Sequence, residues 1–421
     1  MPLPPTPLLF RHAEQLLTLA GPPVPRRGKD LGDLGIVRRG SVLTADAKIF
    51  RVGKTAGLDA EARRLKARVI DCRGRVVMPG FVDSHTHLVF AGSRVEDYEL
   101  RLHGRTYEEI AAAGGGIRLS ARLLCEASTS KLVAQARHFL DQFAAHGTTT
   151  VEVKSGYGLD YSNEMKTLQV VRQLQWHSAI ELVPTLLAAH VLPPEYSGRA
   201  SAYLDLIVEK LIPAVARGKL AEYVDCFCDR GAFRVAQCRR VFEAGLKHGL
   251  VPRLHAEQLT HTGASRLAVE LGATSADHLD CVTDEDVRAL AGSSVVATLL
   301  PGSNFHLGLQ RFVPARRLIE AGAIIALATD FNPGTSPTPN MQMILSIACA
   351  GLRLTPAEAI SAATLNAAYA LRRAHRLGSL EPGKQADLVV MDLDDYRKIP
   401  YYFGVNHCVM TVKRGRIIYP E

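Results

Sequence analysis

The feature that most constrains this chain is a regular alternation of short apolar runs with longer amphipathic segments through its middle. Eight runs are β-rich and end at or beside a polar residue: Phe81–His87, Thr148–Lys154, Glu181–Ala189, Glu222–Cys228, Val251–Ala256, Ala273–Leu279, Ser294–Leu300 and Ile324–Asp330. The segments between them have helical character, as in Lys131–Ala145, Asn163–Trp176, Ala200–Ala216, Val235–Lys247, Thr283–Ala291 and Pro314–Ala321. Strands that alternate with helices pair in parallel. Eight such units predict an α/β fold whose main domain is a TIM-like (β/α)8 barrel.

The two ends of the chain follow a different pattern. Residues 35–76 and 386–419 hold short β-like pieces broken by glycine and charged residues, and no helical period links them. We expect these pieces to form one small β-sandwich domain, with room for a further strand in residues 1–20. The predicted boundaries are 1–78 for the first part of the sandwich, 79–375 for the barrel and 376–421 for the second part.

Composition excludes several classes of protein. The 421 residues are 47% hydrophobic and 22% charged, which are ordinary values for a globular chain. No run reaches the roughly 18 consecutive apolar residues of a membrane span, and residues 1–19 lack the pattern of a signal peptide. We therefore expect a cytoplasmic protein without membrane association. The 50 Lys and Arg exceed the 42 Asp and Glu, giving +8, but they are scattered, so we expect no nucleic-acid partner.

Eight cysteines in a chain of this length are too sparse for a disulfide framework. Cys226 and Cys228 are two apart and would share one face of a strand. We interpret them as reduced core cysteines in preference to a metal or redox pair.

Chemistry-bearing residues gather at the predicted strand ends, where the reacting groups of a parallel barrel lie. His85 and His87 are two apart on an extended segment, so both imidazoles point the same way. His255 ends the fifth run, His278 the sixth and Asp330 the eighth. A lone histidine is more often structural than a ligand, but five such residues at strand ends indicate a metal site. Imidazole and carboxylate donors suit zinc or iron.

Such a site supports hydrolysis. A divalent metal lowers the pKa of water from 15.7 toward ~7, so that hydroxide exists at neutral pH. We expect Asp330 to bind the metal and receive the proton of the water. His278 is placed to donate a hydrogen bond to the developing oxyanion.

The motifs around these residues resemble the amidohydrolase superfamily. The shared segments are Val82–His87, Ala328–Asp330 and the tail Gly378–Val389. A closer resemblance, to the imidazolonepropionase family within it, is carried by His87–Arg94, Glu152–Gly158, Ser275–Leu279 and Thr329–Pro337. The likeness covers the chain from roughly residue 35 to its end.

The resemblance implies one divalent metal per chain, zinc or iron, held by His85, His87, His255 and Asp330. It implies hydrolysis of the cyclic amide of 4-imidazolone-5-propanoate to N-formimino-L-glutamate, a step of L-histidine degradation. It also implies a homodimer. The family's substrate contacts fall on Arg94, Tyr157, His190, Asn332, Gly334 and Thr335.

These contacts are physically reasonable. The Arg94 guanidinium offers a fork for the propionate carboxylate of the substrate. Backbone N–H groups at Gly334 and Thr335 lie where they can meet an anion.

One position departs from a common pattern of related hydrolases, which place Glu three residues after the fifth-strand histidine. That position is Gln258, which cannot accept a proton. We expect Gln258 to contact substrate, and Glu257 is a further acid/base candidate because strand alternation puts it on the face of His255. The source of protons stays open between Asp330, His278 and Glu257.

Lys154 raises the question of a second metal, because binuclear relatives bridge two metals with a carbamylated lysine. Its place at the end of the second run does not match that bridge, so we favour one metal.

Two other functions remain open. One is a cyclic amidohydrolase or deaminase acting on a purine, a pyrimidine or a similar ring. Such a neutral ring has no anionic group for Arg94 to bind. The other is a catalytically silent barrel.

Overall fold

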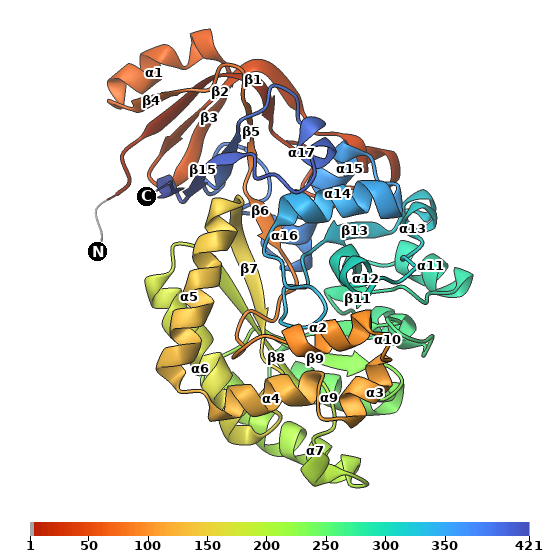
Figure 1. Cartoon of the computed structure of the whole chain (residues 1–421). Helices are drawn as coiled ribbons and strands as arrows, with labels where there is room; N and C mark the ends of the chain where they lie inside the picture. Colours follow the sequence, from red (N-terminus) through yellow and green to blue (C-terminus); the bar gives the residue numbers. More distant parts are fainter. Residues whose placement is uncertain (1–3, 421) are drawn as a thin grey trace.

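The computed structural model of the chain, which describes residues 4–420, contains two eight-stranded sheets built from different parts of the sequence (Figure 1). The sheet formed by the middle of the chain is wholly parallel and follows the chain order. Its strands are β6 (Phe81–Asp83), β7 (Thr148–Lys154), β8 (Glu181–Ala189), β9 (Tyr223–Cys228), β10 (Val251–Ala256), β11 (Ser275–His278), β12 (Val296–Leu299) and β13 (Ile324–Leu327). Each predicted run contains one of these strands, so the barrel prediction is confirmed.

The first and last barrel strands meet through the segments that follow them. The backbone N–H of Asp330 donates to the carbonyl of His85 over 3.1 Å, and that of His87 donates to Phe331 over 2.8 Å. Thr329 also donates from its backbone to the Asp83 carboxylate over 3.1 Å. The seam that closes the barrel therefore carries three of the four predicted metal ligands.

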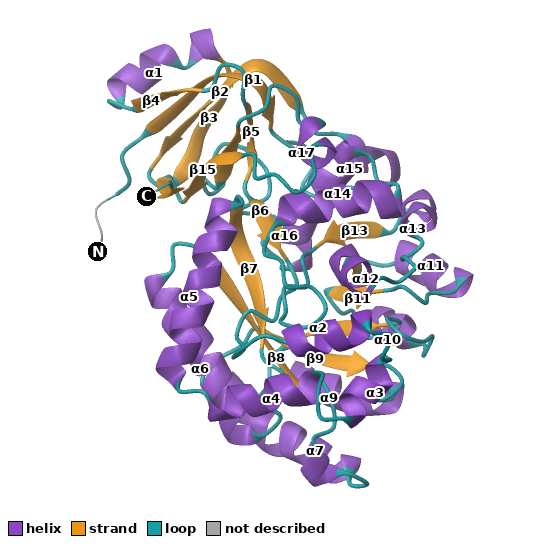
Figure 2. Cartoon of the chain, in the orientation of Figure 1, coloured by secondary structure: helices purple, strands orange, loops and turns teal. Residues whose placement is uncertain are grey.

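Helices cover the outside of the barrel strands (Figure 2). Those expected from the periodicity are α5 (Thr129–Ala145), α6 (Tyr161–His177), α9 (Val235–Lys247), α11 (Asp284–Ala291) and α13 (Ala315–Ala321). The expected helix after β8 is divided into α7 (Ala200–Asp205), a π-helical segment (Leu206–Leu211) and α8 (Ile212–Arg217). Side chains fix two of the helix starts, because Asp160 accepts from the backbone of Asn163 and Thr283 accepts from that of Asp286.

Several helices were not predicted. Three follow β6 before α5: α2 (Val95–Leu102), α3 (Tyr107–Ala112) and α4 (Ile117–Glu126). Those after β10 are α10 (Ala264–Glu270), α12 (Pro301–Leu307), α14 (Met341–Leu352), α15 (Pro356–Ser361), α16 (Ala367–Ala370) and α17 (Lys398–Tyr401). Most are short. The longest of the later ones, α14, is buried along most of its length and so shows little amphipathic period.

The second sheet unites the two ends of the chain. From the first end come β1 (Leu8–Leu17), β2 (Ile36–Ala45), β3 (Lys48–Lys54), β4 (Arg68–Asp71) and β5 (Val76–Pro79), and from the second come β14 (Leu388–Met391), β15 (Cys408–Lys413) and β16 (Arg416–Tyr419). The two groups join where β14 pairs antiparallel with β5. Side chains from both groups share one apolar core, among them Phe10, Val42, Leu388 and Val412. This confirms a terminal β domain.

One feature of this domain was not expected, the short helix α1 (Asp59–Arg64). Leu58 and Ala62 pack against Leu9 and Leu43 on the sheet, in a small apolar cluster separate from the main core of the domain.

Glu181, at the start of β8, links the barrel to the terminal sheet through ion pairs with Lys413, Arg414, Arg373 and Arg376. Burial alone would raise the pKa of Glu181, but these positive charges lower it to about 2.

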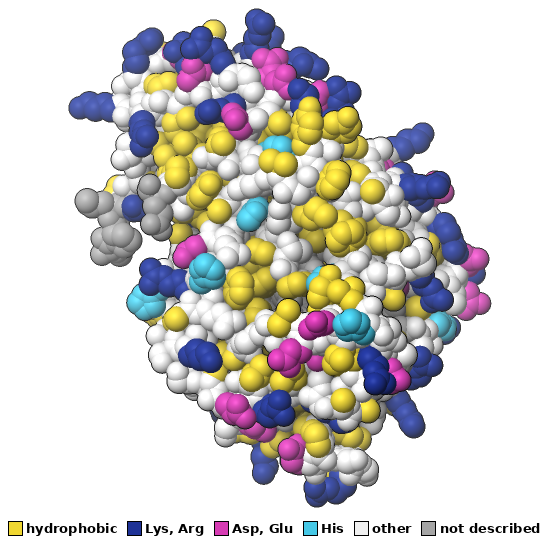
Figure 3. Space-filling model, in the orientation of Figure 1, with side chains coloured by type: hydrophobic (Ala, Val, Ile, Leu, Met, Phe, Trp, Pro, Cys, Tyr) yellow, Lys and Arg dark blue, Asp and Glu magenta, His cyan; other side chains and the backbone are white. Residues whose placement is uncertain are grey.

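Among residues 4–420 there is no helix with the length and hydrophobicity that crossing a bilayer requires. On the face drawn in Figure 3, Lys and Arg side chains are spread around the rim with acidic side chains between them.

Candidate metal centre

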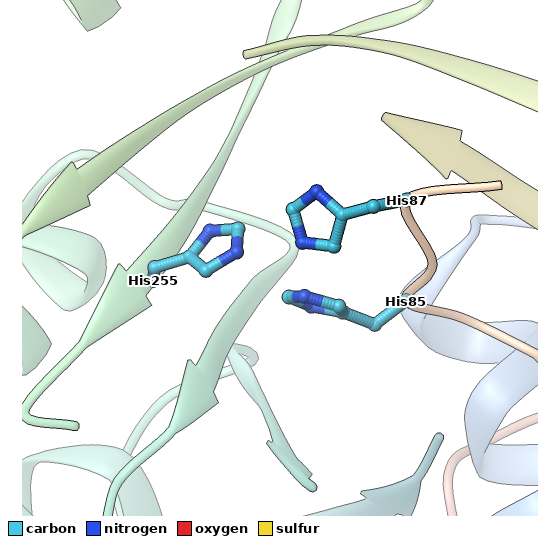
Figure 4. Close-up of side chains that lie close together, drawn as sticks. All are labelled: His85, His87 and His255. Atoms are coloured by element: carbon cyan, nitrogen blue, oxygen red, sulfur yellow. The ribbon is translucent and has the colours of Figure 1, made fainter. Parts of the chain in front are cut away.

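Three histidines from two parts of the barrel turn their rings toward one space. His85 and His87 follow β6, and His255 lies near the end of β10 (Figure 4). One nitrogen of each lies within 4.8 Å of the others. The ring centroid of His255 is 4.5 Å from that of His85 and 5.5 Å from that of His87. The structure thus brings together three ligands that the sequence separates by up to 170 residues.

Asp330 and His278 complete this cluster. Asp330 Oδ1 lies 3.5 Å from His85 Nε2 and 3.6 Å from His87 Nε2. One nitrogen of His278 lies within 4.8 Å of ligand atoms of His85 and Asp330. Both residues have positive φ angles, +53° for Asp330 and +79° for His278, so each marks a break in the regular strand geometry. Five predicted site residues therefore share one buried space.

Two carboxylates orient the histidine rings. Asp277 Oδ2 lies 2.7 Å from His85 Nδ1, and Asp225 Oδ1 lies 3.1 Å from His255 Nδ1. An ionised carboxylate only accepts, so each Nδ1 carries the hydrogen and each Nε2 keeps its lone pair. Sequence reasoning assigned no role to either aspartate. A signal existed at Asp225, which is a charge within the otherwise apolar run of β9.

The donor atoms fit a divalent cation. Nε2 of His85 and Nε2 of His255 are buried without a hydrogen-bond partner. Burial lowers the pKa of His85, His87 and His278 well below the usual histidine value, so the rings are neutral and able to donate a lone pair to a metal. Burial also raises the pKa of Asp330 well above its ordinary value, and a cation at this place would stabilise its ionised form.

His190 and Tyr157 form a wall beside the cluster. The ring of His190 stacks against that of His87 with centroids 5.3 Å apart, and Tyr157 lies 5.6 Å from His190. His190 Nδ1 is 2.9 Å from the carbonyl of Gly156, so Nδ1 donates and Nε2 is the acceptor. Burial lowers the pKa of His190 to about 3, which keeps the ring neutral.

Glu164 holds the turn that carries Tyr157, a role that sequence reasoning missed. Its carboxylate accepts from the backbone N–H groups of Gly156, Gly158 and Leu159 over 2.7–3.2 Å. Burial raises the pKa of Glu164 despite these bonds.

Arg94 is a buried cation at the start of α2. It is 6% exposed, and its Nε has no hydrogen-bond partner. The guanidinium lies against Gly334 so closely that a Cβ at this glycine would stand 1.3 Å from Arg94 Nη2. Only glycine leaves this space. Arg101 donates to the carbonyl of Gly334 over 3.3 Å.

The N–H groups of Gly334 and Thr335 are bonded within their own loop, and the expected contact of these residues with substrate stays a prediction. Asn332 Oδ1 accepts from the N–H of Gly334 over 2.9 Å and from that of Thr335 over 2.7 Å. Asn332 Nδ2 donates to the carbonyl of Asp330 over 2.6 Å. A local side-chain turn therefore occupies the donors that were expected to meet an anion. Asn332, Gly334 and Thr335 shape the loop behind Asp330, and the cations against this loop are Arg94 and Arg101.

The expected orientation of Glu257 is corrected. Its φ of +54° ends the strand alternation after Ala256. The carboxylate accepts from the backbone N–H of Thr262 over 2.6 Å, and from the N–H and hydroxyl of Ser265 over 3.1 and 2.9 Å. Glu257 therefore ties down the start of α10 and groups with His261 and Asp286, apart from the five residues of the cluster; its acid/base role stays a prediction. Gln258 beside it is only partly buried.

The cysteines in β9 lie in the core. Cys226 and Cys228 are fully buried, and Cys226 Sγ lies 2.7 Å from Cys238 Sγ on α9. All eight cysteines are free, and burial raises the pKa of the Cys226 thiol.

Known proteins resemble this chain over nearly its whole length. The Amidohydrolase family model matches residues 68–124 and 108–419. The chain is 46% identical over 415 residues to the imidazolonepropionase of Geobacillus kaustophilus, covering 98% of each chain. The chain belongs to the imidazolonepropionase family of amidohydrolases. Another relative is the imidazolonepropionase of Chloroflexus aggregans, at 46% identity over 98% of this chain and 99% of that one. The resemblance that the motifs indicated is confirmed.

Solved structures share the fold at low identity. Escherichia coli guanine deaminase superposes with a TM-score of 0.73 at 16% identity, covering 98% of this chain and 99% of that one. A zinc-bound adenosine deaminase from Xanthomonas campestris gives 0.64 at 19% identity, covering 99% and 93%.

Proposed function

We propose that this chain hydrolyses the ring amide of 4-imidazolone-5-propanoate to N-formimino-L-glutamate. The proposal rests on full-length identity of 40–47% to imidazolonepropionases. One structural observation supports it most. A buried arginine, Arg94, whose Nε lacks a partner, lies against the loop behind Asp330. A cyclic amide with a carboxylate arm supplies the missing anion, whereas a neutral purine or pyrimidine does not.

His85, His87, His255 and Asp330 would hold one divalent metal, zinc or iron. When bound, the metal supplies Lewis acidity, which lowers the pKa of water from 15.7 toward ~7. The choice of a single metal is supported by Lys154, whose Nζ lies 2.8 Å from both Glu152 Oε1 and Asp225 Oδ2.

Side chains of the protein bind the substrate, transfer the proton and stabilise the oxyanion. Arg94 binds the propionate arm and orients the ring. Asp330 accepts the proton of the attacking water, and this proton later reaches the ring nitrogen that leaves. His278, buried beside it, donates a hydrogen bond to the oxyanion that forms on the ring carbonyl. The water oxygen joins the carbonyl carbon, the C–N bond breaks, and the carbonyl becomes the new carboxylate.

Three other residues line the substrate pocket. His190 and Tyr157 contact the ring from the wall beside His87, and Gln258 reaches the substrate from the end of β10. Glu257 is the weakest of the acid/base candidates because its carboxylate already accepts four hydrogen bonds from Thr262 and Ser265.

The test is a turnover assay on purified chain with 4-imidazolone-5-propanoate, run beside guanine, cytosine and dihydroorotate, with metal analysis of the same sample. We expect turnover of the imidazolone alone and about one metal per chain. Turnover of a neutral ring in its place would favour the deaminase alternative.

We also propose a homodimer with a cytoplasmic location. An apolar surface supports the dimer. Phe305, Tyr401 and Phe403 are 58%, 74% and 72% exposed, and apolar side chains gather over α14 and α17 in Figure 3. Light scattering on the purified chain gives its mass in solution, and a monomeric mass would refute the dimer.

A further inference from the structure

Five charged side chains lie together beneath the histidines. They are Glu152 and Lys154 on β7, Asp225 on β9, Arg253 on β10 and Asp277 on β11, and none is more than 1% exposed. Three carboxylates face two cations. Charges buried this completely persist only where partners compensate their lost hydration.

Two members of this set touch the proposed metal ligands. Asp277 orients His85 over 2.7 Å, and Asp225 orients His255 over 3.1 Å. Carboxylates in this position fix the ring tautomer and make the imidazole a better donor to a metal. The Asp225 and Asp277 carboxylates must in turn be held in place by a further side chain.

Lys154 meets both of these carboxylates. Its Nζ lies 2.8 Å from Asp225 Oδ2 and 3.8 Å from Asp277 Oδ2, and it also donates to Glu152 Oε1 over 2.8 Å. Arg253 reaches Asp277 over 3.5 Å and Glu152 over 3.8 Å, but its Nη2 hydrogen-bonds mainly to the carbonyl of Ser84 over 2.7 Å. Lys154 is therefore the cation that connects the His85 side of the site to the His255 side.

Lys154 is held as an ammonium. Burial alone would lower its pKa, but Asp225 and Glu152 raise it above its ordinary value. A carbamate would replace this ammonium, which lies 2.8 Å from two carboxylates, with a negatively charged group.

We propose that Lys154 is a positioning residue that sets the metal affinity of the site. It fixes Asp225 and Asp277 in the orientation that turns Nε2 of His85 and His255 into the shared space. The proposal rests on the proposed metal site, and it acts through the carboxylates without contact to substrate.

The experiment compares Lys154→Met with a matched buried lysine. Lys413 is 3% exposed and lies 2.8 Å from Asp387 Oδ2 at the contact between barrel and terminal sheet. Zinc affinity is measured by chelator competition on metal-free protein, and folding by thermal unfolding. We expect Lys154→Met to raise the zinc Kd about 10- to 100-fold. Lys413→Met should lose stability but keep the wild-type zinc Kd.

A second variant keeps the test decisive if Lys154→Met alone does not fold. Lys154→Met combined with Glu152→Gln restores the wild-type balance of one excess negative charge, because one carboxylate leaves with the ammonium. We expect this pair to regain stability while the zinc Kd stays raised. Recovery of the wild-type Kd would overturn the proposal, since charge balance alone would then explain the loss.

The remaining outcomes separate this inference from the proposed function. A folded Lys154→Met with the wild-type zinc Kd overturns the inference, as does an equal loss of affinity in Lys413→Met. If the wild-type chain binds zinc but does not open the imidazolone, the substrate assignment fails and the role of Lys154 is judged on the Kd values alone.

Discussion

Gly334→Ala is expected to weaken substrate binding through Arg94. The new Cβ would stand 1.3 Å from Arg94 Nη2 and 1.7 Å from its Cζ, so the guanidinium must move. Gly334 has no positive φ, so the conflict is steric and falls on the far end of a flexible side chain. The fold should therefore survive.

The magnitude follows from the contact that is lost. A charge-assisted hydrogen bond to a carboxylate contributes about 1.5–3 kcal/mol. At 1.4 kcal/mol for each factor of ten, kcat/KM should fall about 10- to 100-fold. Most of the loss should appear in KM, because the propionate arm does not change during ring opening.

The assay is steady-state kinetics with 4-imidazolone-5-propanoate and with a 4-imidazolone that lacks the arm. Gly57→Ala is the control, since nothing lies within 4 Å of a Cβ at that glycine. The double variant with Arg94→Ala should lose little more than either change alone, because both remove one interaction. A wild-type KM in folded Gly334→Ala, or an equal loss on the armless ring, would refute the reasoning.

Three other predictions follow from the site and the domain contact. His87→Ala should abolish turnover and leave the thermal unfolding of the metal-free chain nearly unchanged; turnover by metal-free mutant protein would contradict this. Gln258→Leu should raise KM more than it lowers kcat in the same kinetics, and a loss confined to kcat would argue against a binding role. Glu181 has a folded pKa of about 2, below the ordinary 4.5, so its contribution to stability is present above pH 4.5 and is lost as pH falls toward 2. At pH 7, denaturant unfolding should give Glu181→Gln a free energy of unfolding lower than that of wild type by at most about 3 kcal/mol. This difference should shrink as the pH falls from 4.5 to 2. A difference that does not change with pH would refute the ion-pair account.

The barrel was predictable because its signal repeats along the chain. The buried parallel strands lie in short β-rich runs that are mostly apolar, and the covering helices keep one apolar face. The metal centre was predictable for a related reason. A barrel directs its strand ends to one face, so His255 and Asp330 needed only their strand assignments to be placed with His85 and His87.

Local hydrogen bonds escaped the sequence reasoning where side chains, and not the strand pattern, set the backbone. Asn332 takes the N–H groups of Gly334 and Thr335, an alternative to anion binding that the loop sequence does not reveal. Glu257 leaves the strand at a positive φ and turns to Ser265. Periodicity carries no information on either event.

The carboxylates behind the histidines were missed for a further reason. Asp225 contacts His255 on the neighbouring strand β10, whereas Asp277 on β11 contacts His85, which follows the non-adjacent strand β6. Such contacts depend on packing across the whole sheet, so the sequence of one strand alone does not predict them.

The most direct test of the metal centre is anomalous X-ray diffraction from crystals of the purified chain, recorded at the zinc and iron absorption edges. We expect one anomalous peak per chain, within bonding distance of His85, His87, His255 and Asp330. A metal-loaded and catalytically active chain whose peak lies away from these four side chains would contradict the account.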